Sequence, residues 1–240
     1  MGDTCPESGR FTDHLWDRTK PLRAAIENLE FLRRLGDGTL PLPAFRCYVE
    51  QDELYLTGFA RALALTAAQA PDPQTAAFWA NSSATATTVE STLHESLLAA
   101  LPPADTAPEP SPTCLGYYSY LIATAATAPY PVAAAAVLPC FWIYAEVGRD
   151  LARSAQQVLE RDPEHPYARW VSTYDAPEFQ ESAATARALV DAAAEAATAS
   201  ERDAMTEAFT VAMRYELMFW DTALHPLTWP AGDEPAGDTA

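Results

Sequence analysis

The apolar residues of this chain recur at helical spacing in every segment long enough to interpret, and no stretch alternates at period two as a half-buried strand does. No other feature of the sequence constrains the fold more, because a helical period does not supply the alternating faces of a sheet. It predicts an all-α protein. We expect one domain over residues 1–230 with roughly seven or eight helices, and an acidic, disordered tail at 231–240.

Proline and glycine mark where these helices begin and end. Pro21 is expected to kink or split the first helix, and Gly36-Asp37-Gly38 to stop it. The segment 101–113 holds five prolines and few apolar residues, and is expected to be a loop. The helices expected from the apolar periodicity cover residues 10–35, 43–70, 73–100, 114–127, 132–159, a short stretch around 167–174, 179–198 and 200–224.

The formal net charge of −18 argues against nucleic acid and anionic membranes as partners, because such a surface repels both. No apolar run reaches the ~18 residues of a membrane span, and the first residues lack the basic and apolar regions of a signal peptide. The four cysteines show neither CxxC pairing nor metal-ligand spacing: Cys5, Cys47, Cys114 and Cys140. We therefore expect no disulfide framework, no metal site and a cytoplasmic location.

An acidic residue interrupts an aromatic stripe in the helix expected at 43–70. The stripe consists of residues 3, 4, 3 and 4 positions apart on one helical face: Phe45, Tyr48, Asp52, Tyr55 and Phe59. A carboxylate is costly to bury without a partner, so its position suggests a function. The alternative is a capping or turn aspartate, but Asp52 lies well inside the helix, where aspartate gains nothing from helix propensity.

A cysteine follows a proline at the end of the apolar run 132–138, and aromatic residues come directly after it. Pro139 can open a helix or kink one. Cys140 and Tyr144 then stand four residues apart and share a helical face. A thiol beside a phenol on a buried face could be a nucleophile with its hydrogen-bond donor. It could equally be part of the core, since free cysteine is among the most buried residue types.

The helix expected at 200–224 also carries a carboxylate among apolar residues. Its apolar face contains residues 4, 3 and 4 positions apart: Phe209, Met213, Glu216 and Trp220. Three helices therefore each present one reactive group, namely Asp52, Cys140 and Glu216. A cysteine and two carboxylates among tyrosines suit covalent chemistry on a flat, nitrogen-bearing ring. Periodicity alone does not show that the three helices converge.

A metal site is the competing possibility in the helix expected at 73–100, where Glu90 and His94 stand four residues apart. Di-iron bundles use a Glu-x-x-His motif twice, together with two further glutamates. This chain has four histidines and no second such motif. A hydrogen-bonding pair is therefore the expected role of these two residues.

Six segments, in order along the chain, together resemble the TenA family, that is, thiaminase II or aminopyrimidine aminohydrolase. The resemblance extends over roughly residues 10–225, and any one segment would be weak on its own. The segments are Gly36–Pro41, Tyr48–Asp52 with Tyr55, Leu56 and Phe59, Pro112–Tyr117, Leu138–Gly148, His165–Pro166 with Trp170–Tyr174, and Tyr215–Trp220. The resemblance implies a heme-oxygenase-like helical bundle, usually a homotetramer, that acts on 4-amino-5-substituted-2-methylpyrimidines without metal or cofactor.

The resemblance also implies roles for particular residues. The family's nucleophile, in its Pro-Cys-x-Trp segment, falls on Cys140. The carboxylate that grips the amino group and ring nitrogen of the pyrimidine matches Asp52, and the acid that protonates the ring corresponds to Glu216. The aromatic pocket positions of the family fall on Tyr55, Tyr117, Tyr144, Tyr174 and Phe219. The implied reaction, part of thiamin salvage, releases hydroxymethylpyrimidine from 4-amino-5-aminomethyl-2-methylpyrimidine or from thiamin.

Three positions depart from the family pattern: Cys47, Glu53 and Gly58, where an aromatic, a less charged and a bulkier residue are expected. They are expected to alter the pocket wall or a subunit contact rather than the chemistry. Two other classes of function remain open. One is a non-catalytic binder of a thiamin-derived pyrimidine or of a partner protein on the same fold. The other is a helical-bundle oxidase or redox protein related by fold to heme oxygenase or to di-iron enzymes, which would need a set of histidine ligands that the four histidines of this chain do not form.

Overall fold

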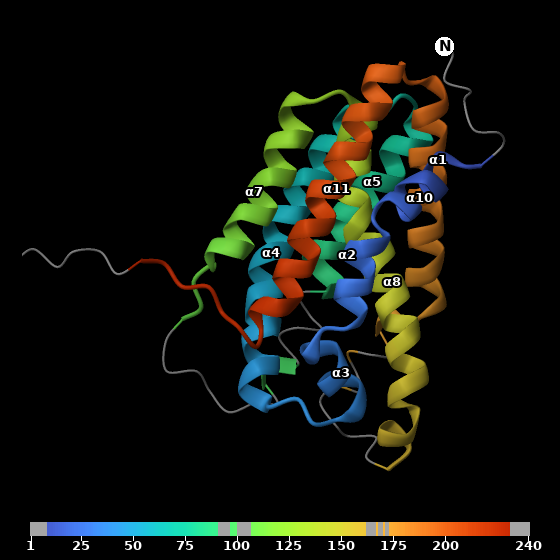
Figure 1. Ribbon diagram of the computed structural model, residues 1–240. Coiled ribbons are helices and arrows are strands. Elements are labelled where there is room, and N and C mark those ends of the chain that lie inside the picture. The colour runs from blue at the N-terminus through green and yellow to red at the C-terminus, as the bar shows by residue number, and fades with distance from the viewer. Residues whose placement is uncertain are drawn as a thin grey trace, which may run out of the picture.

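The computed structural model describes residues 9–90, 97–99, 107–161, 167, 170 and 173–230. These residues form a helical bundle without a strand among them, which confirms the all-α prediction for the described part of the chain (Figure 1). The helices are α1 (Phe11–Arg18), α2 (Lys20–Glu27), α3 (Glu30–Asp37), α4 (Leu42–Ala68), α5 (Pro73–Thr85), the π-helical turn η1 (Ala86–Glu90), α7 (Pro112–Thr127), α8 (Tyr130–Arg161), α10 (Pro177–Ala196) and α11 (Ala199–Thr222). The tail at 231–240 lies outside the described residues, so the domain limits stay a prediction.

The segment expected as one helix at 10–35 is three short helices. Thr19 leaves the helical conformation between α1 and α2, and Pro21 enters the first turn of α2, so the predicted split is confirmed. A second break, at Asn28 and Leu29, separates α2 from α3, although the apolar spacing gave no sign of it. Gly38 takes a left-handed conformation, with φ 76°, directly after α3, which confirms the predicted stop.

The later helices begin at residues that favour helix starts. Asp72 accepts hydrogen bonds from backbone N–H groups in the first turn of α5, and Ser111 does the same for α7. Thr198 and Glu201 form a capping box at the start of α11. Helix α7 begins at Pro112, two residues before the expected start at Cys114, and the described part of the expected loop at 101–113 therefore ends at Ser111.

The central helix of the bundle is α8, and Cys140 lies in its middle. It packs against α10 and α11 and also contacts α3, α4 and α7. The run Ala133–Leu138 is fully buried, and its four alanines leave room for the neighbouring helices to approach. Pro139 lies within the helix and has no N–H to donate to the carbonyl one turn earlier.

The sequence predicts no membrane span, on the basis of unbroken apolar runs. By length and composition, the part Tyr130–Arg153 of α8 is apolar enough to cross a membrane. However, 83% of its apolar window is buried inside the bundle, as in the core helix of a soluble protein, so it is weak support for a membrane span.

On the side of α8 that faces away from Cys140, two tryptophans are stacked between two arginines. Trp142 of α8 stacks on Trp16 of α1, with ring centroids 4.0 Å apart and planes 13° apart. Arg23 of α2 lies 3.9 Å above the Trp16 ring, and Arg187 of α10 lies 4.1 Å above the Trp142 ring. We call these four residues the arginine–tryptophan stack. It fixes α1, α2 and α10 against the helix that carries Cys140.

Two glycines allow close approaches that position the elements of the site. A Cβ added at Gly58 of α4 would lie 2.5 Å from the Tyr118 side chain of α7. A Cβ added at Gly148 of α8 would lie 2.7 Å from the backbone of Tyr174. Both distances are too short for any larger residue without movement of the neighbour. Gly58, which departs from the family pattern in the sequence, is therefore explained by the packing of α4 on α7.

Candidate active site

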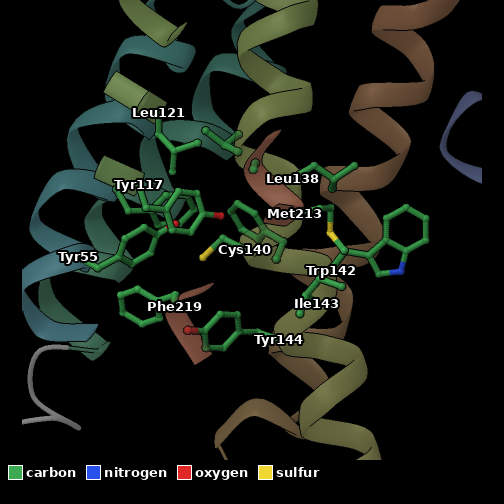
Figure 2. Packing of buried hydrophobic residues seen from close by; sticks show 14 of the residues in the cluster. Tyr55, Tyr117, Leu121, Leu138, Cys140, Trp142, Ile143, Tyr144, Met213 and Phe219 are labelled. Carbon is green, nitrogen blue, oxygen red and sulfur yellow. The ribbon is translucent and has the colours of Figure 1, made fainter. Parts of the chain in front are cut away.

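The eight residues that the sequence singles out come together from four long helices and from the helical residues Thr173 and Tyr174, which precede α10. They are Asp52 and Tyr55 on α4, Tyr117 on α7, Cys140 and Tyr144 on α8, Tyr174 before α10, and Glu216 and Phe219 on α11. All eight are buried, and Cys140 is the most exposed of them at 9%. Figure 2 shows the Cys140 sulfur directed toward the space between Tyr55, Tyr117 and Phe219, with the Tyr144 hydroxyl nearby.

Aromatic rings form the walls around this space. Tyr55 stacks on Tyr117 with ring centroids 4.8 Å apart and packs against Phe219 at 5.4 Å. On the other side, Tyr144 packs against Tyr174 at 5.2 Å. The flat faces of these rings favour a flat aromatic ligand.

Glu216 is a buried acid with one oxygen bonded and one oxygen available. The Tyr117 hydroxyl donates a hydrogen bond of 2.7 Å to its Oε1, whereas its Oε2 has no hydrogen-bond partner among the described residues. Burial raises the pKa of Glu216 to about 8; the Tyr117 hydrogen bond lowers it, the charge of Asp52 raises it, and the neighbouring Trp220 side chain lowers it. Glu216 is therefore mostly a protonated acid at neutral pH, which can donate a proton to a bound ring.

Asp52 lies deep inside α4, with 2% of its surface exposed, so the capping alternative is wrong. The Tyr48 hydroxyl lies 3.4 Å from its Oδ2 and 3.1 Å from the Tyr144 hydroxyl. The sequence placed Tyr48 in the aromatic stripe but not in the site. The signal that could have identified it is its position four residues before Asp52, on the same helical face.

The Cys140 thiol is surrounded by phenols. Burial raises the pKa of Tyr55 and Tyr117 well above that of an ordinary phenol, and the charge of Cys140 raises both further. The two hydroxyls are therefore within electrostatic reach of the sulfur. The single proton of Tyr117 is donated to Glu216, whereas the Tyr55 hydroxyl, which keeps its proton near neutral pH, can donate to a Cys140 thiolate.

Cys140 opens on a small inner cavity of about 20 Å³, which is room for roughly one water molecule. The residues lining the inner cavity are Asp52, Leu56, Phe59, Cys140, Phe141, Tyr144, Tyr174 and Phe179. A larger outer chamber of about 410 Å³ shares four of these, Phe59, Phe141, Tyr174 and Phe179, as its inner wall. The rest of its lining includes polar side chains such as Asn81, Ser82 and Glu178.

Among the described residues, no three His, Cys, Asp or Glu side chains lie together in a way that could hold a metal ion. The pair Glu90 and His94 lies outside the residues whose side chains are described. Of the two remaining departures from the family pattern, Cys47 is half-buried, and Glu53 lines a separate groove with Thr57 and Arg61. Neither Cys47 nor Glu53 lines the inner cavity among the described residues.

Comparison with known proteins identifies a single family across most of the chain. The model of the TENA/THI-4/PQQC family matches residues 16–225. A thiamine biosynthesis multifunctional protein, ThiED, from Corynebacterium glutamicum is 38% identical over 90% of this chain, but the match covers 27% of that protein. The chain thus spans about a quarter of the length of the two multifunctional relatives of this kind. An aminopyrimidine aminohydrolase from Bacillus subtilis is 34% identical over 83% of both chains.

Solved structures show the same arrangement of helices. A TenA homologue from P. horikoshii OT3 has a TM-score of 0.78 and 29% identity, over 90% of this chain and 99% of that one. A domain with a heme oxygenase-like fold from Shewanella denitrificans has a TM-score of 0.67 at 14% identity, over 89% of this chain and 91% of that one. The predicted heme-oxygenase-like bundle is therefore confirmed.

Proposed function

The chain belongs to the TENA/THI-4/PQQC family, and we propose that it is a thiamin-salvage hydrolase that uses Cys140 as a covalent nucleophile. Its proposed substrates are 4-amino-5-aminomethyl-2-methylpyrimidine and thiamin, and its product is 4-amino-5-hydroxymethyl-2-methylpyrimidine. The observation that carries the proposal is that the Cys140 thiol, the Asp52 carboxyl and the protonated Glu216 lie in one buried site whose walls are aromatic rings. The B. subtilis relative, an aminopyrimidine aminohydrolase by name, supports the same chemistry.

Each group of the site has a task in binding the pyrimidine. Asp52 accepts hydrogen bonds from the 4-amino group, and the rings of Tyr55 and Phe219 stack on the flat face of the substrate. The inner cavity is smaller than a pyrimidine, so the four aromatic side chains of its shared wall must move apart as the substrate arrives from the outer chamber. The outer chamber then holds whatever leaves from the 5-methylene group.

The reaction starts when the Cys140 thiolate adds to the unsubstituted ring carbon next to C5. The π electron pair of the double bond between this carbon and the adjacent ring nitrogen moves to that nitrogen, which takes the proton of Glu216. Electrons from the 4-amino nitrogen then form an exocyclic C=C bond at C5 as the leaving group departs, either as ammonia from the protonated aminomethyl group or as the neutral thiazole. Water adds to the methylene carbon and releases one proton to solvent, and the electron pair of the exocyclic bond returns toward the 4-amino nitrogen. The Cys140–carbon bond then breaks with its electron pair on sulfur, and the ring proton returns to Glu216.

The decisive experiment measures release of hydroxymethylpyrimidine from both substrates by the wild type, Cys140→Ser and Cys114→Ser. Cys114 is the matched control, because it is fully buried and its Sγ lies 3.4 Å from the carbonyl oxygen of Gln51. We expect turnover by the wild type and by Cys114→Ser, and loss of turnover in Cys140→Ser. Binding of either compound by the wild type without release of product would refute the hydrolase and favour a non-catalytic binder.

We propose, on the family resemblance, a homotetramer that works without cofactor, and, on the cysteine pattern of the sequence, a cytoplasmic location. The net charge of −18 supports a small-molecule partner rather than nucleic acid or an anionic membrane. Light scattering of the purified protein tests the tetramer, and a monomer at micromolar concentration would refute it.

A further inference from the structure

Tyr48 lies one helical turn before Asp52 in α4 and touches two residues of the site. Its hydroxyl lies 3.4 Å from Oδ2 of Asp52 and 3.1 Å from the hydroxyl of Tyr144. Among the described residues, Asp52 and Tyr144 line the inner cavity and Tyr48 does not. We propose that Tyr48 is a positioning residue, which holds the Asp52 carboxylate and the Tyr144 phenol in the orientation that binds the pyrimidine. The inference rests on the proposed function, which assigns both partners to the substrate.

The ring of Tyr48 is held on several sides and cannot swing away. Trp220 stacks on it with ring centroids 5.3 Å apart, and Phe31 packs against it at 5.1 Å. Trp170 and Phe219 approach edge-on at 6.0 and 6.1 Å. Only 2% of the Tyr48 surface is exposed, so these neighbours hold its ring, and with it the hydroxyl, in one position. The hydroxyl is therefore a fixed reference point for the groups bonded to it.

The Tyr48 hydroxyl is oriented to donate to either of its two partners, the Asp52 carboxylate and the Tyr144 hydroxyl. A phenol has a single proton, so Tyr48 donates to one of them at a time, while both oxygens stay within hydrogen-bonding distance of its own. Burial raises the pKa of Tyr48 and of Tyr144 well above that of an ordinary phenol, so both keep their protons near neutral pH. Through these contacts, Tyr48 links α8, which carries Cys140 and Tyr144, to the Asp52 carboxylate on α4.

The first test is Tyr48→Phe, which keeps the ring and removes both bonds. We expect KM for 4-amino-5-aminomethyl-2-methylpyrimidine to rise about tenfold, because a hydrogen bond to a charged group is lost. We expect kcat to change by less than about threefold, since the nucleophile and the acid stay in place. An unchanged KM would overturn the proposal.

Tyr130→Phe is the matched control for a purely structural effect. The Tyr130 hydroxyl, at the start of α8, accepts a hydrogen bond of 3.1 Å from Nε1 of Trp79. Both variants lose a hydrogen bond of a tyrosine in the bundle, so both should melt at a lower temperature than the wild type. Only Tyr48→Phe should change KM. An equal rise of KM in the two variants would show that Tyr48 acts through stability alone.

A double-mutant cycle identifies the partner through which Tyr48 acts. In an Asp52→Asn background, adding Tyr48→Phe should weaken substrate binding by no more than about twofold, because the carboxylate that it positions is already gone. If Tyr48→Phe weakens substrate binding about tenfold in the Asp52→Asn background as well, the two residues act independently and the proposal is overturned.

The affinity for hydroxymethylpyrimidine, measured by calorimetry, tests the role of Tyr48 separately from the hydrolase proposal, because binding of the product needs folded protein but no turnover. A wild type that binds the product without hydrolysing either substrate refutes the hydrolase, while the affinities of wild type and Tyr48→Phe still decide the role of Tyr48. A wild type that does not bind the pyrimidine refutes both.

Discussion

Replacing Tyr117 by phenylalanine should move the alkaline limit of activity to higher pH. The Tyr117 hydroxyl bonds Glu216 Oε1 at 2.7 Å, and this bond lowers the pKa of Glu216 because it favours the charged carboxylate. Burial outweighs the bond and holds the pKa at about 8. The proposed mechanism needs the protonated acid, so activity should fall as the pH rises through this pKa.

The size of the effect follows from the two pKa values. At pH 7, a pKa of about 8 leaves roughly nine-tenths of Glu216 protonated, whereas the ordinary value of 4.5 would leave roughly three in a thousand. Burial therefore increases the acid form about 300-fold. A hydrogen bond to a charged group contributes about 1.5–3 kcal/mol, and one pKa unit corresponds to about 1.4 kcal/mol. Loss of the Tyr117 bond should therefore raise the pKa by about 1–2 units.

The assay is kcat/KM for the aminomethylpyrimidine from about pH 6 to 10, since kcat/KM reports the free enzyme. Tyr117 also belongs to the pocket wall, so the midpoint of the alkaline limb is compared, not the absolute rate. Tyr120→Phe is the control on the same helix, because its hydroxyl bonds the Ala208 carbonyl at 3.2 Å instead. A midpoint that stays in place, or moves to lower pH in Tyr117→Phe, would refute the assignment of Glu216 as the acid.

Three further predictions concern stability and packing. Folded Glu216 keeps a proton that the unfolded chain releases, so stability should fall by about 1.4 kcal/mol per pH unit between about pH 5 and 8. Glu216→Gln should flatten this slope in urea titrations and exceed the wild type in stability above about pH 8, and an unchanged slope would contradict the buried acid. Gly58→Ala places a Cβ 2.5 Å from Tyr118 and should cost about 1–3 kcal/mol of unfolding free energy, part of which Tyr118→Ala should restore. Gly148→Ala presses on the backbone of Tyr174, 2.7 Å away, and should raise KM as well as lower the melting temperature; a normal KM would argue against Tyr174 in the pocket.

The sequence predicts the helices well where local chemistry decides their limits. Pro21 and Gly38 act through backbone restrictions that hold in any surroundings, so the breaks they predict are present. The break at Asn28 and Leu29 carries no proline or glycine, and the π-helical turn at Ala86–Glu90 keeps a near-helical spacing. Apolar periodicity is blind to both features, because a local change in winding leaves the spacing of apolar residues almost unchanged.

The sequence suggested which residues form the candidate site, but it did not show how the helices bring them together. Periodicity put Asp52, Cys140 and Glu216 each on a buried face, but which faces meet depends on the packing of whole helices against α8. The spacing of α4 indicates the contact of Tyr48 with Asp52, but the contact with Tyr144 lies between two helices and could not be predicted from the sequence. Gly58 looked like a loss of bulk from sequence alone, and only the position of Tyr118 shows that the space is already filled.

The arginine–tryptophan stack gives the protein an optical signal of its own. The indole rings of Trp16 and Trp142 are 4.0 Å apart and nearly parallel, so their electronic transitions are coupled and should give a characteristic near-ultraviolet circular dichroism band. Trp142 lies two residues after Cys140 on the central helix, so a shift of that helix when the sulfur bonds to a ring carbon or is alkylated would change the coupling. Chemistry at the sulfur could thus be followed in unlabelled protein, in real time, from the opposite side of the same helix.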